Sequence, residues 1–355
     1  MSSTPTSLPP HVQVSLPQPV QVRATNTTSR LFSRLGWLGF FLCGMLVLIQ
    51  WSAMATYFDN TGGITEQYHS RDKSSNEKVA IIDISGVIME GEGYVKKQIE
   101  RIEEDDSVKA VVIRVNSPGG TVTGSDYIYH YLRKFREERP HIPVVVSMGS
   151  LAASGGYYVA MAVGHQEKAV FAEPTCTTGS IGVIIPHYDI SRLMERFDIR
   201  DDSISSHPRK QMLSITRAMS DEERQLVQGY VNESYERFLE IVRSGRKQFD
   251  ENPDALRQLA TGEIFSATQA KKNGLIDEIG FLDDAIDRVC ELAGINAKEV
   301  RVVHFPRPQS LLSLSGFARS PQPDNHLAML LDLSTPRAYY LASSWPTLMT
   351  SRRAD

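Results

Sequence analysis

The chain has 355 residues, 41% of them hydrophobic and 23% charged, an ordinary balance for a globular protein with a sizeable core. A formal net charge of −4 provides no basic excess for binding nucleic acid, so we expect no nucleic-acid partner. With only 3 cysteines a disulfide framework is excluded, although one bridge between Cys176 and Cys290 is left open.

The N-terminal part of the chain combines a polar tail with an apolar stretch. Residues 1–33 are rich in Ser, Thr, Pro and Gln, a composition that predicts a disordered tail. Residues 34–58 predict a transmembrane anchor, because charges stop at Arg34 and resume at Asp59, and about 20 apolar positions suffice to cross a bilayer. Three arginines precede the stretch, so the tail is expected in the cytoplasm and the remainder outside the membrane. Cleavage after Ala55 is an open alternative.

Beyond a linker at residues 59–77, strand-like and helix-like segments alternate as far as residue 304. This alternation predicts one α/β domain over residues 78–304, with repeated βα units, a parallel sheet and right-handed crossovers. The predicted strands are 79–84, 110–115, 144–148 and 168–172, and the predicted helices are 94–104, 124–136 and 155–162.

A long amphipathic helix and a proline-rich tail complete the chain. Ser220 and Glu223 have the spacing of a capping box, which predicts a helix that extends to about Phe249. Prolines interrupt the apolar patches of residues 305–355, which predicts a tail without a core of its own. Two of its patches, 329–331 and 338–341, are candidates for docking on the domain, on a neighbouring subunit or on the membrane. The apolar residues of the helix are predicted core or subunit contacts: Leu226, Tyr230, Tyr235, Phe238 and Ile241.

Ser154 is the first candidate catalytic residue. It follows an apolar strand-like segment, lies in the run Ala152-Ala153-Ser154-Gly155-Gly156, and opens a stretch with helical character. A hydroxyl at a strand-to-helix turn is exposed at the sheet edge, where the free N–H groups of the helix can stabilise a developing oxyanion. A purely structural glycine turn explains the same run equally well.

A second glycine turn favours the catalytic interpretation. Residues 109–115 are strand-like and end in Asn-Ser-Pro-Gly-Gly at 116–120. Because the carboxyl ends of parallel strands meet at one edge of a sheet, the two turns are expected to come together. Amides of Gly119 or Gly120 and of Gly155 then form a candidate oxyanion hole with two donors.

The chain resembles the signal peptide peptidase A family of serine–lysine proteases, which have a fold like that of Clp protease and crotonase. Five motifs in the family's order carry the resemblance: 116–120, 152–157, Thr-Gly-Ser-Ile-Gly-Val at 178–183, Lys210 before a Ser/Thr-rich stretch, and 270–278. The fold that this implies is an α/β domain of repeated ββα units with C-terminal helices, preceded by one transmembrane helix.

The resemblance also implies the catalytic roles. Ser154 falls on the family's nucleophile, Lys210 on its general base, and Ser180 on the serine that orients the lysine. A serine hydroxyl needs an adjacent base, and a lysine can serve only when its surroundings favour the neutral amine. Arg209 precedes Lys210, but an arginine stays protonated and cannot be that base.

The activity that the resemblance implies is a membrane-bound endopeptidase at the bacterial inner membrane, with its catalytic domain on the periplasmic side. Its substrates would be signal peptides that remain after secretion, and other apolar peptides. The implied assembly is a homo-oligomer in which Ser154 of one subunit meets Lys210 and Ser180 of the next. No cofactor or metal is implied.

Other kinds of site and function have less support in the sequence. None of the 9 histidines lies in a strand-end motif, since His130 and His141 flank a predicted helix and His187 follows in a polar loop. Neither His-Glu-x-x-His nor Cys-x-x-Cys occurs, so no metal site is expected. An acyl-CoA enzyme of the crotonase type and a catalytically silent scaffold for membrane protein quality control are the alternative functions.

Overall fold

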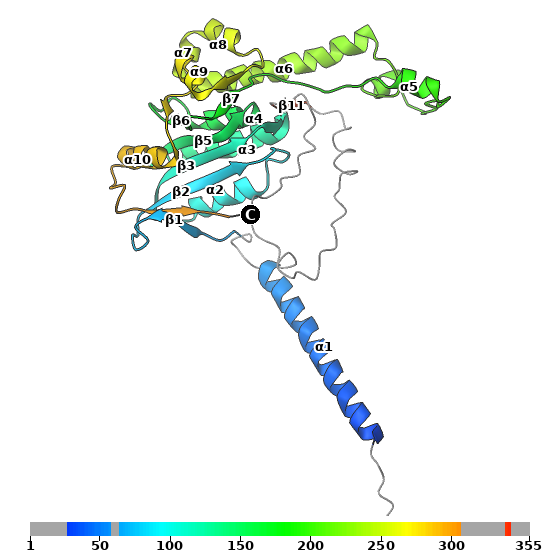
Figure 1. The fold of residues 1–355 in the computed structure, drawn as a ribbon, viewed down its shortest axis with the longest axis vertical. Coiled ribbons are helices and arrows are strands. Elements are labelled where there is room, and N and C mark those ends of the chain that lie inside the picture. The colour runs from blue at the N-terminus through cyan, green and yellow to red at the C-terminus, as the bar shows by residue number, and fades with distance from the viewer. Residues whose placement is uncertain (1–26, 58–63, 307–337, 342–355) are drawn as a thin grey trace, which may run out of the picture. The chain divides into compact units, whose positions relative to one another are not determined.

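The computed structural model describes residues 27–57, 64–306 and 338–341 (Figure 1). Most of the predicted tail at 1–33 and the patch at 329–331 therefore lie outside the described residues. The chain divides into two units, residues 1–59 and 60–355, which are described separately.

In the N-terminal unit, the helix α1 extends over Thr27–Tyr57. It begins inside the segment predicted to be a disordered tail, because no proline or charge cluster separates Thr27 from the apolar run that follows. In the described part of the chain, no helix was found with both the length and the apolar character needed to cross a membrane. The anchor at 34–58 stays a prediction.

The second unit is the α/β domain that the alternating pattern predicted. Its strands are β1 (Gln67–Arg71), β2 (Lys78–Ser85), β3 (Val108–Ser117), β4 (Gly119–Thr121), β5 (Val144–Ala153), β6 (Val170–Ala172), β7 (Thr177–Gly179), β8 (Ile264–Ser266), β9 (Glu278–Ile279), β10 (Arg301–His304) and β11 (Tyr339–Leu341). Its α-helices are α2 (Tyr94–Glu103), α3 (Val122–Glu138), α4 (Gly155–Ala160), α5 (Ser191–Arg196), α6 (Asp221–Gly245), α7 (Lys247–Glu251), α8 (Pro253–Leu259), α9 (Ala267–Lys272) and α10 (Leu282–Ala293), with 3₁₀ turns η1 (Met161–Val163) and η2 (Pro208–Gln211).

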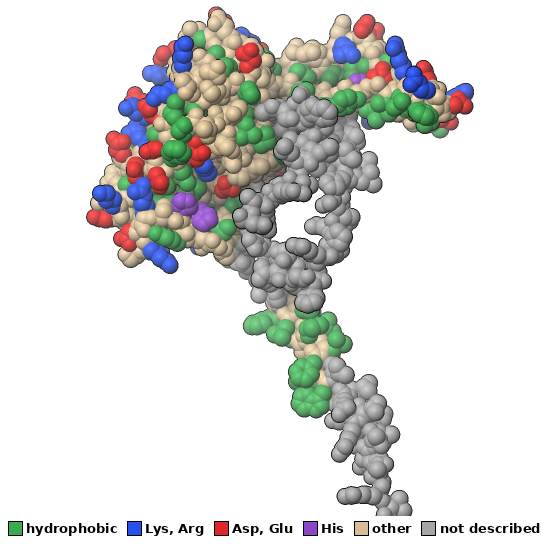
Figure 2. Space-filling model, viewed as in Figure 1, with side chains coloured by type: hydrophobic (Ala, Val, Ile, Leu, Met, Phe, Trp, Pro, Cys, Tyr) green, Lys and Arg blue, Asp and Glu red, His purple; other side chains and the backbone are tan. Residues whose placement is uncertain are grey.

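The main sheet has the strand order β1-β10-β2-β3-β5-β6-β9, and β2, β3, β5 and β6 run parallel. Its central strands are almost wholly apolar and buried, as expected for strands that are covered on both faces. Helices α2 and α3 pack on each other, whereas α10 packs on β3 and β5 (Figure 1). Helices α2 and α3 connect β2, β3 and β5 in one direction across the sheet, and α10 connects β9 back to β10 in the other. Right-handed crossovers that run in opposite directions place their helices on opposite faces, so α10 covers the face that α2 and α3 leave open. On the side that Figure 2 shows, acidic and basic side chains are interspersed over this unit.

Strand β5 is longer than predicted. The apolar pattern suggested an end at Met148, but the strand extends to Ala153. Its first half pairs with β6, from Val146 to Met148, and its second half pairs with β7, from Leu151 to Ala153. A second pairing partner thus carries the strand beyond Met148 and through Gly149.

Helix α6 starts as predicted and stops earlier than predicted. Ser220 and Glu223 form both hydrogen bonds of the capping box. The helix ends at Gly245, because Arg246 turns into an extended conformation and its buried guanidinium pairs with Asp277 at 2.8 Å. The predicted core face is only partly buried: Phe238 and Ile241 are buried and Tyr235 packs against the core, whereas Leu226 and Tyr230 are half exposed.

Candidate active site

Ser154 lies at the junction between β5 and α4. Its backbone has φ 53° and ψ −116°, a strained combination for a residue with a side chain. The neighbouring structure enforces it, because the Ser154 N–H donates to the carbonyl of Gly179 at 2.8 Å and its own carbonyl accepts from Tyr158 at 2.8 Å. The side chain is 1% exposed, and Oγ has no hydrogen-bond partner among the described residues. A buried, unpaired hydroxyl at a strained turn is a strong candidate for a nucleophile.

The two predicted glycine turns come together beside Ser154. A β-carbon added to Gly119 would lie 2.6 Å from the backbone nitrogen of Gly155, and one added to Gly155 would lie 3.1 Å from that of Gly120. Only glycine permits this approach, and Gly119 also has φ +98°. The Gly119 N–H donates to Ser117 Oγ at 3.0 Å, which leaves Gly120 and Gly155 as the better candidates for oxyanion donors.

Ser180 lies next to Ser154 in the same chain. Strand β7 pairs with the end of β5, with Ala153 opposite Gly179, so that Ser180 follows directly after the residue that binds the Ser154 amide. Ser180 is buried and also has a positive φ, of 51°. The resemblance implied that a neighbouring subunit supplies this serine, but the pairing of β7 with β5 places it beside the nucleophile of its own chain.

Lys210 is not in the same place as the two serines. It lies in η2, within the segment 185–220 that we call the arm, and its side chain is exposed. Because Ser154 Oγ has no partner within hydrogen-bond distance in the described chain, Lys210 does not reach it there. The structure thus brings together Ser154, Ser180 and the glycine turns, and leaves the predicted base apart from them.

Neither a histidine nor a cysteine takes the place of the lysine. His187 Nε2 lies 3.1 Å from the carbonyl of Ser214, so it bridges two parts of the arm, and no histidine of the described chain contacts Ser154 Oγ. Cys176 and Cys290 are separate free thiols. Burial raises the pKa of Cys176 to about 12 and that of Cys290 to about 11, which disfavours the reactive thiolate. The described residues contain no cluster of metal-ligating side chains.

The C-terminal segment Ala338–Leu341 packs against this site. The sequence predicted only that the segment could dock on another surface. Strand β11 pairs antiparallel with β4, with Tyr340 opposite Gly120, and Tyr339 exchanges two hydrogen bonds with Ile184 on its other side, at 2.9 and 3.0 Å. The segment is therefore held between the second glycine turn and the chain that follows β7. Of the three docking places considered for it, the domain is the one observed.

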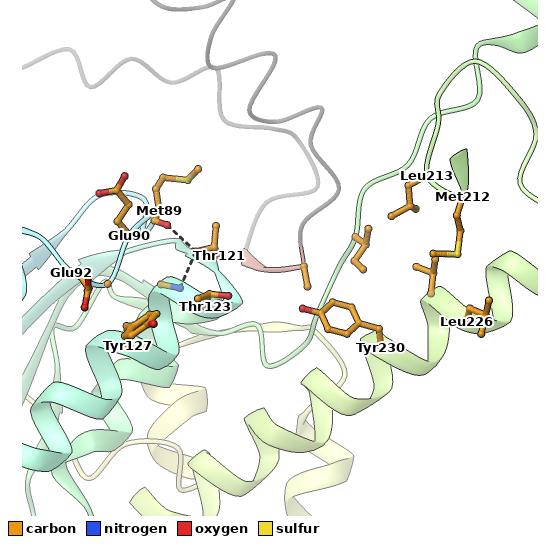
Figure 3. A pocket seen from close by; sticks show the side chains of 15 residues that line it. Met89, Glu90, Glu92, Thr121, Thr123, Tyr127, Met212, Leu213, Leu226 and Tyr230 are labelled. Atoms are coloured by element: carbon orange, nitrogen blue, oxygen red, sulfur yellow. Dashed lines mark hydrogen bonds between the residues drawn. The ribbon is translucent and has the colours of Figure 1, made fainter. Parts of the chain in front are cut away.

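A hollow lies beside this segment. The cavity of about 710 Å³ is bordered by Thr121 and Ala338 and is lined mainly by apolar side chains (Figure 3). Tyr127 of α3 and Tyr230 of α6 border it from opposite sides, and Met212 of the arm lies on the same side as Tyr230. Ser154 is not among the residues that line the cavity, but Thr121 directly follows the second glycine turn, and an apolar cavity there can accept an apolar side chain of a bound peptide.

Comparison with known proteins agrees with this geometry. Residues 136–296 match the model of peptidase family S49, and residues 72–179 match that of Clp protease. The chain is 34% identical to a putative signal peptide peptidase SppA of Enterococcus faecium over 242 residues, which cover 65% of this chain and 67% of the relative. It is also 34% identical to a putative protease of Synechocystis, over 67% of this chain and 83% of the relative.

The chain belongs to peptidase family S49. Its membership makes it a serine peptidase and confirms the family that the five motifs indicated. The matched region of the S49 model begins within α3 and ends just after α10, so it includes Ser154, Ser180 and Lys210. A longer relative, protease 4 of Salmonella typhi, is 34% identical over 71% of this chain, but the match spans only 41% of that protein.

Proposed function

We propose that this S49 peptidase is a membrane-anchored endopeptidase that cleaves remnant signal peptides and other apolar peptides with a serine–lysine dyad. The observation that carries the proposal is the buried Ser154 hydroxyl, which lies at a strained turn beside two converging glycine turns and has no hydrogen-bond partner among the described residues. The substrate class follows from the name of the Enterococcus faecium relative and from the apolar cavity.

In the proposed reaction, Ser154 Oγ attacks the carbonyl carbon of the scissile peptide and its proton passes to the neutral amine of Lys210. The amides of Gly120 and Gly155 stabilise the resulting oxyanion. Collapse of the tetrahedral intermediate expels the amine of the leaving peptide, which takes the proton from Lys210. Water then hydrolyses the acyl-enzyme by the same route and restores the serine hydroxyl.

A neighbouring copy of the chain is the proposed source of the lysine. Lys210 is exposed, whereas Ser154 Oγ is buried and unpaired, so the two residues of the proposed dyad lie apart within one chain. Lys210 of one copy can then serve Ser154 of the next. The arm also exposes large apolar side chains of the kind that subunit interfaces bury. These side chains are Tyr188, Leu193, Phe197, Ile199 and Ile204.

The anchor is proposed from the sequence of α1. Residues 35–58 carry no charge, and the part of the helix whose side chains are described exposes large apolar residues (Figure 2), among them Trp37, Phe41 and Trp51. Lipid would bury this surface and place the catalytic domain on the periplasmic side of a bacterial inner membrane. Release of the full chain from membranes by alkaline carbonate, without detergent, would contradict the anchor.

A serine-directed fluorophosphonate tests the function directly. We expect the full chain, purified in detergent, to hydrolyse signal-peptide fragments and to lose this activity when the reagent labels Ser154 in a stoichiometric reaction. A chain that hydrolyses acyl-CoA and leaves peptides intact would support the crotonase-type alternative. A chain with neither activity nor labelling would support the silent scaffold.

Ser180→Ala is expected to lower kcat by roughly tenfold to a thousandfold, the scale for loss of one positioning or donor group. The hydroxyl is proposed to orient the lysine amine, so KM should change little and Ser154 should still react with the fluorophosphonate. Steady-state kinetics on a peptide substrate measure the effect, and Ser191→Ala in the exposed helix α5 is the matched control. If the reagent labels Ser180 and not Ser154 in the wild-type chain, this assignment is refuted.

A further inference from the structure

Strand β5 contains a bulge shortly before the candidate nucleophile. Its pairing with β3 is continuous as far as Val115 and Met148, and it resumes at Ser117 and Ala152. Between these two pairs β3 has one residue, Asn116, whereas β5 has the three residues 149–151. A bulge changes the direction of the strand that contains it, and bulges are frequent next to active sites. The path of these three residues therefore determines where the end of β5 lies.

The side chain of Asn116 contacts this bulge. Its Oδ1 accepts hydrogen bonds from Ser150 Oγ at 2.9 Å and from Leu151 N–H at 3.3 Å. A β-carbon added to Gly149 would lie 3.4 Å from Asn116 Cγ, so the same side chain also closes the space beside Gly149. The Ser150 bond joins two side chains, whereas the Leu151 bond holds the backbone of the bulge.

Other contacts fix the two ends of the bulge. Before it, the guanidinium of Arg114 pairs with Glu173 at 2.5 Å, and the Glu173 N–H donates to the carbonyl of Met148 at 3.0 Å. After it, the end of β5 pairs with β7, and the Ser154 N–H donates to the carbonyl of Gly179. These contacts hold the strand on either side but do not fix the path of the three residues between them.

The position of Ser154 leaves little room for a change in this path. Successive side chains of a strand point to opposite faces, so a shift of one residue would turn the end of β5 over. A β-carbon added to Gly155 would lie 3.0 Å from Gly119 Cα and 3.1 Å from the Gly120 nitrogen, so the two turns are already in close contact. A misplacement of about 1 Å can cost a reaction roughly a hundredfold in rate.

We propose that Asn116 is a positioning residue, whose side-chain carbonyl holds the bulge of β5 in the path that places Ser154 beside the second glycine turn. This inference rests on the proposed function and adds a residue that acts on the reaction through Ser154. Asn116 itself touches no reacting atom, and its role depends on one hydrogen-bond acceptor at one position.

Three substitutions of Asn116 test the role of this acceptor in the full chain. Asn116→Ala is expected to lower kcat for a signal-peptide fragment roughly tenfold to a hundredfold and to change KM less than about twofold, because peptide binding does not depend on the bulge. Asn116→Asp keeps an oxygen for both donors and should stay within about threefold of the wild-type kcat. Asn116→Leu has a similar shape without an acceptor and should be as slow as Asn116→Ala.

The pattern among the three variants separates positioning from packing. Recovery in Asn116→Leu as good as that in Asn116→Asp would assign Asn116 to packing and overturn the proposal, as would a wild-type kcat in Asn116→Ala or a change confined to KM. Asn296→Ala is the matched control, since Asn296 is also exposed and its Oδ1 also accepts from a backbone N–H, that of Lys298 at 3.1 Å. This control should keep the wild-type kcat. If Asn116→Ala fails to fold in urea titrations, the comparison of Asp with Leu decides.

The rate of labelling of Ser154 distinguishes failure of this inference from failure of the proposed function. We expect the second-order rate constant for a fluorophosphonate to fall about tenfold or more in Asn116→Ala and to recover in Asn116→Asp, because the reagent needs the same placement of Oγ. A wild-type chain that is labelled but hydrolyses no peptide would overturn the proposed function alone. Equal labelling rates in the wild type, Asn116→Ala and Asn116→Leu would refute the positioning role, even if peptide hydrolysis is confirmed.

Discussion

Ser154→Ala is expected to abolish peptide hydrolysis, with a loss of at least roughly a thousandfold, and to leave the domain folded. The reaction loses its nucleophile, because the other hydroxyls at the glycine turns already have partners: Ser117 Oγ accepts from Gly119 N–H, and Ser125 Oγ donates to the carbonyl of Thr121. The fold should persist, since alanine keeps the β-carbon and Oγ makes no hydrogen bond that would be lost. Hydrolysis rates together with urea unfolding measure the two effects.

Two further variants sharpen this test. Ser150→Ala alters another serine of β5, an exposed one that donates to Asn116, and should retain activity. Ser154→Gly should be as inactive as Ser154→Ala but more stable by about 1 kcal/mol, because glycine tolerates the positive φ at this position. Substantial hydrolysis by Ser154→Ala would move the nucleophile elsewhere.

A mixed oligomer of Ser154→Ala and Lys210→Ala chains is expected to recover about one quarter of the wild-type activity, although each variant alone is inactive. If each site takes its serine from one subunit and its lysine from the next, random assembly of equal amounts pairs intact partners in about one site of four. Co-expression with two affinity tags, followed by tandem purification, yields the mixed oligomer, and peptide hydrolysis per subunit measures the recovery.

The matched control pairs Ser154→Ala with a Ser154→Ala/Lys210→Ala chain, in which no site has an intact serine, and should stay inactive. The double variant should be scarcely worse than either single one, because nucleophile and base act as a unit. A mixed oligomer that assembles normally and has no activity would contradict a shared site. Full activity of Lys210→Ala alone would assign the base to another residue.

Several features of this chain follow from local sequence. The largely apolar runs at 79–84 and 110–115, each with a single charged residue, determine buried parallel strands, because such runs satisfy a sheet that is covered on both faces. Ser220 and Glu223 determine the start of α6, since a capping box needs only residues within one turn. The glycines at 119–120 and 155–156 indicated the site, because strand ends of a parallel sheet share one edge.

Only the tertiary structure decided what depends on pairing between distant segments. The extension of β5 to Ala153 depends on β7, and the same pairing places Ser180 beside Ser154. The end of α6 depends on Asp277, which holds Arg246 from another part of the chain. The docking of Tyr340 depends on free edges at β4 and Ile184 and on an open aromatic pocket. Such contacts join residues that are far apart in the sequence, and their free energy comes from surfaces that exist only once the sheet has formed, so no local pattern encodes them.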